Sequence, residues 1–73
     1  MKNVFTAYVE FDPDSQLYVG IIPGIAGAHT QGATLDELQH NLQEVMELCI
    51  EENPEIAENP PHFVGIQQVE VSG

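Results

Sequence analysis

The chain of 73 residues suits one small domain, and 42% hydrophobic residues are enough to form a core. Twelve acidic residues and a single basic one give a formal net charge of −11. This charge argues against direct nucleic-acid binding and against attachment to an anionic membrane, because both would repel the chain. The charge fits either solubility and salt adaptation or a basic protein partner, and composition leaves both readings open.

The N-terminal residues lack the apolar core of a signal peptide, and no segment has membrane-spanning length. Cys49 is the only cysteine, so no internal disulfide can form, and a lone thiol fits a reducing compartment. We therefore expect a cytoplasmic protein. A domain this small without disulfides commonly gains stability by association of subunits.

The first half of the chain predicts strands. Residues 4–11 alternate with a period of two, a turn at 12–16 follows, and 17–22 is the returning strand of a hairpin. A weaker third strand is predicted at 28–32. One face of the first strand carries Phe5, Ala7, Val9 and Phe11. A second apolar face of the hairpin is assigned to Val4, Tyr8, Tyr18 and Ile22. One helix cannot cover both faces, so we expect a homo-oligomer.

A capped helix is the clearest element of the sequence. Thr34 is a good N-cap, and Glu37 three residues later completes the pattern of a capping box. The helix is expected to stop near Asn53, because Pro54 disfavours helical geometry in the residue before it. Its apolar stripe comprises Leu35, Leu38, Leu42, Val45, Met46, Cys49 and Ile50. The opposite side is acidic.

A last strand is predicted at Phe63 to Val71. The order is then strand, strand, strand, helix, strand. This order defines a single α+β domain over 1–73, a small antiparallel sheet of three to four strands with one main helix packed on one face.

The candidate catalytic and metal-binding residues form no recognisable set. The glycine loop from Pro23 to Gly32 lacks the lysine and the spacing of nucleotide-binding loops, so its glycines are interpreted as shaping the backbone. Cys49 lies on the apolar stripe, where burial keeps a thiol protonated. The other candidates are the hairpin carboxylates and the histidines, namely Glu10, Asp12, Asp14, His29, His40 and His62. None matches a ligand pattern, so we expect no enzyme, no metal and no cofactor.

The run from Tyr18 to Glu52 resembles the HicB-like antitoxin family. The matching positions are Tyr18, Pro23, Gly27, Thr30, Gly32, Thr34, Glu37 and Asn41. The resemblance covers Val4 to Glu52 and implies a partial ribonuclease-H-like fold. It departs from the family at Ala28, where a cysteine is frequent. Only Ser72 and Gly73 follow Val71, so we expect no C-terminal DNA-binding segment and no direct regulation of an operon.

The resemblance implies that the chain is an antitoxin that neutralises a small basic HicA-type mRNA-cleaving toxin by covering its active site. The acidic composition fits such a partner. The residues expected to bind it are Tyr18, Glu37, Glu44, Glu47, Leu48 and Glu51. Two alternatives stay open: an oligomeric domain of the same fold that binds another protein or a small ligand without a toxin, and, less favoured, a metal-dependent nuclease.

Overall fold

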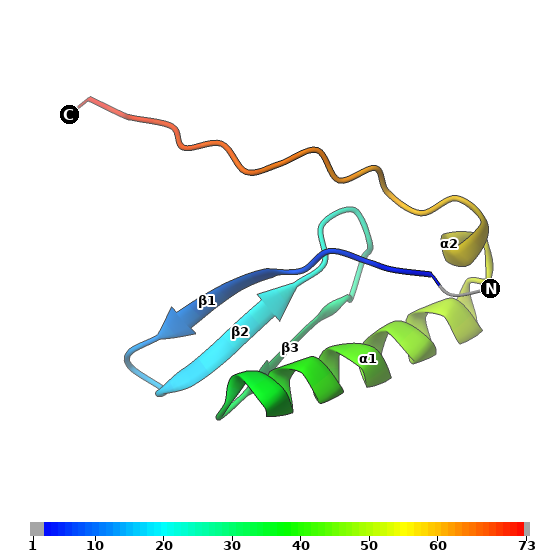
Figure 1. The fold of residues 1–73 in the computed structure, drawn as a ribbon, viewed down its shortest axis with the longest axis horizontal. Helices are drawn as coiled ribbons and strands as arrows, with labels where there is room; N and C mark the ends of the chain where they lie inside the picture. Colours follow the sequence, from blue (N-terminus) through cyan, green and yellow to red (C-terminus); the bar gives the residue numbers. More distant parts are fainter. Residues whose placement is uncertain (1–2, 73) are drawn as a thin grey trace.

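The computed structural model describes residues 3–72 and contains one sheet packed against one long helix (Figure 1). Its elements in chain order are β1 (Tyr8–Asp12), β2 (Leu17–Ile21), β3 (His29–Gly32), α1 (Leu35–Glu52) and α2 (Glu55–Glu58). The strands are antiparallel in the order β1-β2-β3. The α+β class, the small sheet and the order of three strands before the main helix are confirmed.

The turn between β1 and β2 is held by the side chain of Asp12. One carboxylate oxygen accepts a hydrogen bond from the Asp14 amide at 3.1 Å, and the other accepts one from the Ser15 hydroxyl at 2.9 Å. Gln16 has a positive φ of 63°, and its backbone N–H donates a hydrogen bond to the Asp12 carbonyl at 2.8 Å. This local network explains how the hairpin closes without a glycine in the turn.

The register across this turn decides which strand residues meet the helix. Val9 pairs with Gly20 and Phe11 pairs with Tyr18, whose ring centroid lies 5.0 Å from that of Phe11. The face of the first strand that carries Val9 and Phe11 therefore lies toward the helix. The assignment of Tyr18 and Ile22 to a second, uncovered face is wrong: Ile22 is a buried core residue and Tyr18 packs against the core. A period of two shows which residues of one strand share a face. Which residues of the neighbouring strand lie on that same face depends on the pairing register.

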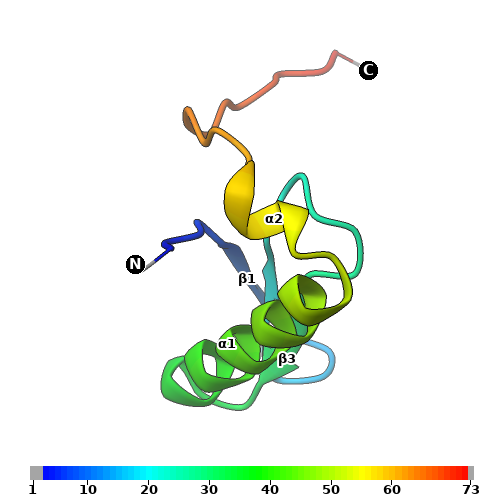
Figure 2. The ribbon, with the colours of Figure 1, turned by 90° about the vertical axis from the view of Figure 1, so that its right-hand side faces the viewer.

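Helix α1 lies across β3 and β2 (Figure 2). Its apolar stripe packs toward the sheet, in one core with Ile22 and Ala28. The Thr34 hydroxyl oxygen accepts a hydrogen bond from the Glu37 amide at 3.1 Å, which confirms the N-cap. Leu38, Leu42 and Met46 are buried, whereas Leu35 at the start of the predicted stripe is exposed. The core is small and consists of Ile22, Ala28, Leu38, Leu42 and Met46.

Gly32 is the point of closest approach between the sheet and α1. A methyl group on Gly32 would lie 2.6 Å from the backbone nitrogen of Leu38 and 3.0 Å from its Cα atom. These atoms belong to the helix backbone, which cannot move aside as a side chain can. Gly24 and Gly27 in the preceding loop have positive φ angles of 88° and 80°. The glycines of this loop therefore serve backbone shape and close packing.

The predicted last strand at 63–71 is not formed. The chain after α2 is extended, but it pairs with no other described strand and its apolar side chains are exposed (Figure 1). At its start, Pro61 packs against Gly24, where an added methyl group would meet the proline ring at 3.0 Å. Alternating apolar residues favour an extended backbone, but a strand also requires a free edge within reach. Within this single chain, the extended segment 63–71 does not reach a free strand edge.

Candidate partner-binding surface

The outward side of α1 forms an acidic face, defined by Glu37, Glu44, Glu47, Leu48 and Glu51. All five residues are exposed, and they follow from helical spacing because the stripe of buried residues occupies the opposite side. Leu48 is 62% exposed. Glu44 precedes it by four residues and Glu51 follows it by three, so both flank it on the helix surface. The acidic face thus surrounds one apolar side chain with carboxylates.

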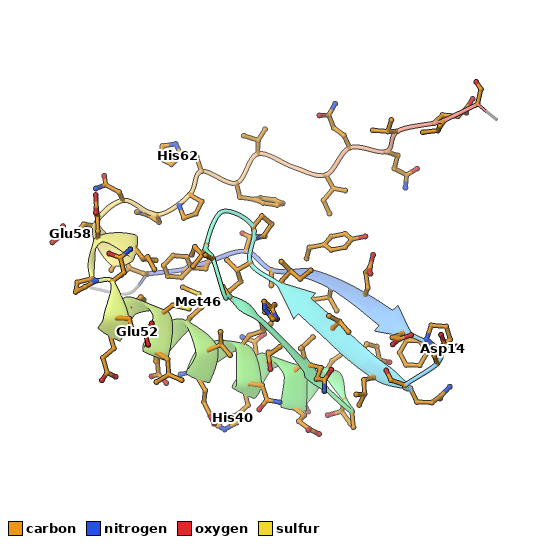
Figure 3. All side chains as sticks on the ribbon, turned by 180° about the vertical axis from the view of Figure 1, so that it is seen from behind. Asp14, His40, Met46, Glu52, Glu58 and His62 are labelled. Atoms are coloured by element: carbon orange, nitrogen blue, oxygen red, sulfur yellow. The ribbon has the colours of Figure 1, made fainter. Side chains whose placement is uncertain are left out.

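The carboxylates of the acidic face have almost no positive neighbours. Within the described chain, the one such contact joins His40 Nε2 and Glu44 Oε1 at 2.8 Å, and it is an ion pair only when His40 is protonated. Both side chains are largely solvent-exposed. Figure 3 shows His40 directed away from the sheet. The last turn of α1 contains Glu51 and Glu52 and no basic residue. These two carboxylates lie at the negative end of the helix dipole, where they are unfavourable.

Salt is expected to stabilise the fold because it screens this repulsion. Raising NaCl from about 0.02 M to about 0.5 M should raise the Tm by about 5 °C, since exposed charges are screened within a few ångströms at high ionic strength. Glu51→Lys should raise the Tm at low salt and weaken the salt response. Thermal unfolding followed by circular dichroism measures both. A Tm that stays constant or falls with added NaCl would contradict this expectation.

Tyr18 does not belong to the acidic face. It lies on β2, on the side of the sheet that faces α1, half-buried beside Phe11. The residues expected to bind a partner therefore divide into an exposed group on α1 and one aromatic residue packed between sheet and helix. Tyr18 packs against the core, apart from the helix residues, and its part in binding a partner stays a prediction.

Asn41 has a role that the residue pattern alone did not reveal. Its side-chain nitrogen donates a hydrogen bond to the Gln31 carbonyl at 2.8 Å, which ties α1 to β3. Since β3 is the last strand of the sheet, this contact occupies a backbone acceptor on that edge. The only prior signal was the position of Asn41 in the run that resembles the antitoxin family.

The remaining candidates are scattered. The Tyr8 hydroxyl donates a hydrogen bond to Glu10 Oε2 at 3.1 Å, and this bond together with the carboxylate charge raises the pKa of Tyr8. Asp12 is engaged in its turn, as described above. Among residues 3–72, no three histidine, cysteine or acidic side chains are grouped as metal ligands. Cys49 is a half-buried free thiol. No helix in the described part of the chain is long and apolar enough to cross a membrane.

The fold and the surface define a small α+β domain with three antiparallel strands, one packed helix and an acidic outer face. The UPF0150-like family profile matches residues 3–52, so the chain belongs to this family. A UPF0150 protein of Thermotoga maritima is 47% identical, with 97% of each chain covered. UPF0150 proteins of Synechocystis sp. and Archaeoglobus fulgidus are 41% and 37% identical, covering 96% and 92% of this chain and 97% and 93% of theirs. No solved structure matches significantly.

Proposed function

We propose that this UPF0150-like chain is an antitoxin-type inhibitor that binds a small basic protein of the HicA toxin type through the acidic face of α1. The observation that carries the proposal is the exposed Leu48 set among glutamates on a helix that contains no Lys or Arg. The resemblance of Tyr18 to Glu52 to HicB-like antitoxins supports the same partner. In this function the chain itself catalyses nothing and acts by covering the toxin's active site.

Leu48 and the glutamates would contribute differently to binding. An exposed leucine at the centre of a contact loses its hydration on binding and serves as an anchor. The surrounding carboxylates sit at the rim, where they accelerate encounter with a basic partner and exclude acidic competitors. The described helix residues include no Lys or Arg, and only Glu44 among these carboxylates contacts a histidine, so the others can pair with the partner's basic side chains.

Binding to a small basic protein encoded beside this chain tests the proposal. Isothermal titration calorimetry with the catalytically inactivated partner should show tight binding that weakens as NaCl rises. Leu48→Asp is expected to weaken binding at least about 100-fold, because it places a carboxylate in the desolvated centre. Glu51→Lys should weaken it as well. Its control is Glu70→Lys, which makes the same change of charge at an exposed position off the acidic face and should leave binding intact.

No binding at low or high salt with such a partner present would overturn the proposal. Equal loss of binding in the Glu51→Lys and Glu70→Lys variants would show that net charge, and not the position of the carboxylates on α1, determines binding. The alternative, an oligomeric domain of this fold without a toxin, is favoured by the exposed apolar residues outside α1. A gene without a small basic neighbour would support that alternative.

A further inference from the structure

An apolar groove lies between β1 and α1, because α1 covers β3 and β2 and leaves the outer strand open. The groove has a volume of about 810 Å³. One wall is formed by Phe5, Ala7 and Val9, and the other by Leu35, Met46 and Ile50. Among the described residues that line it, only Glu47 is charged. The groove therefore carries much less charge than expected for a chain with a net charge of −11.

The C-terminal tail, residues 62–72, is also apolar and poor in charge, like the groove. It is extended and unpaired, and its exposed apolar side chains are Phe63, Val64, Ile66, Val69 and Val71. Val64 is 97% exposed and Val69 is 82% exposed. Glu70 is the only acidic residue in the tail. The stretch 63–71 is longer than β1, the five-residue strand at the open edge of the sheet.

The two edges of the sheet differ in availability. On β3 the helix approaches closely, and the Gln31 carbonyl already accepts a hydrogen bond from Asn41. On β1 no other described strand pairs along the outer edge, and the groove lies beside it. An edge with free backbone groups next to an apolar groove can accept a further strand, with main-chain bonds on one side and side-chain burial beneath.

The surface left exposed by a single chain is large enough for such a contact. The accessible surface is 6027 Å², whereas a compact monomer of this mass exposes about 4,500 Å². The radius of gyration is 13.8 Å, against about 11 Å for a compact chain of this length. Two copies together carry an excess of roughly 3,000 Å², which lies within the range of obligate dimer interfaces.

We propose that the tail of one copy adds as a strand to the β1 edge of a second copy and fills that copy's groove, in a reciprocal exchange that makes the protein a dimer. The connection at Asn59 to Pro61 favours exchange over closure within one chain. Consecutive prolines stiffen it, and Pro61 packs on Gly24. Beyond this point the tail runs apart from the strands in both views (Figures 1 and 2). Charge supports the same arrangement, since two such acidic chains can associate only through surfaces poor in charge.

The exchange accounts for the alternating pattern of 63–71, which predicts a strand although the isolated chain forms none. It also leaves the acidic face of α1 outward, so each copy in the dimer presents its Leu48 to solvent. The acidic face and the groove share Glu47 at their border, but Leu48 and Glu51 do not line the groove. Variants at Leu48 and in the tail therefore separate the inhibitor function from the dimer.

Light scattering coupled to size-exclusion chromatography tests the exchange in the full-length chain. The wild type should have twice the mass of 8.0 kDa. The double variant Ile66→Asp, Val69→Asp places one carboxylate on each side of the tail and should weaken self-association at least about 100-fold, giving a monomer at micromolar concentration. The matched control is Leu48→Asp, which makes the same kind of change at an exposed apolar residue outside the groove and should remain a dimer.

Nuclear magnetic resonance of a mixture of isotope-labelled and unlabelled chains then identifies the contact. We expect intermolecular nuclear Overhauser effects between 63–71 of one copy and 4–11 of the other, absent in the tail variant. The proposal would be overturned by a monomeric wild type or by a tail variant that remains dimeric. It would also be overturned if nuclear Overhauser effects between 63–71 and 4–11 occurred only within one chain. Loss of toxin binding in Leu48→Asp with the dimer retained leaves the exchange unaffected, so the two proposals fail independently.

Discussion

Gly32→Ala is expected to cost about 3 kcal/mol of the free energy of unfolding, at the upper end of the range for overpacked sites. The added methyl group would lie 2.6 Å from the Leu38 backbone nitrogen and 3.1 Å from the Glu37 carbonyl carbon. Relief requires the whole N-terminal turn of α1 to move away from β3. A chain of this length has only about 4 to 11 kcal/mol in total, so the loss is a large fraction of its stability.

The control for Gly32→Ala is Gly27→Ala. Gly27 has a positive φ of 80°, but a methyl group there would meet no atom within 4 Å. The second variant therefore isolates backbone strain, which is expected to cost about 1 kcal/mol. Urea denaturation at a single protein concentration measures both, because self-association makes stability depend on concentration. An equal cost in the two variants would mean that the contact between Gly32 and α1 is unimportant.

Leu38→Ala is expected to destabilise the protein by about 3 kcal/mol, within the range for buried leucines. Leu38 is 2% exposed and is the largest fully buried side chain. Its side chain lies against Gly20 and its backbone against Gly32, so truncating the side chain leaves a cavity where helix and sheet meet. With so few buried residues, the neighbouring side chains have little means of filling that cavity.

Leu48→Ala is the matched control, because it is the same substitution on the same helix at a side chain that is 62% exposed. It should change the free energy of unfolding by less than about 0.5 kcal/mol. Thermal and urea unfolding of the two variants, again at one concentration, give the comparison. A similar loss in both would show that α1 is not held by its buried stripe.

The parts of the fold that depend on nearby residues were predictable. Thr34 caps α1 because its hydroxyl reaches an amide three residues on, and the acidic face follows because helical spacing separates Glu44, Leu48 and Glu51 from the buried stripe. These relations need no knowledge of distant segments. Helical spacing therefore predicted which residues of α1 share its exposed side, and their role in binding a partner stays a prediction. Tyr18, in contrast, was assigned to the wrong side of the sheet.

Local sequence by itself determined the strand and helix preferences, the cap, and the concentration of negative charge on the helix, because each depends on residues within one or two turns. Tertiary structure decided the rest. Pairing across the hairpin placed Tyr18 and Ile22 toward the helix. The path of α1 back across β3 explained Gly32, because it brings the backbone of Glu37 and Leu38 against this residue. The stretch 63–71 carries a strand pattern without a strand, because an extended segment becomes a strand only when another edge supplies its hydrogen bonds.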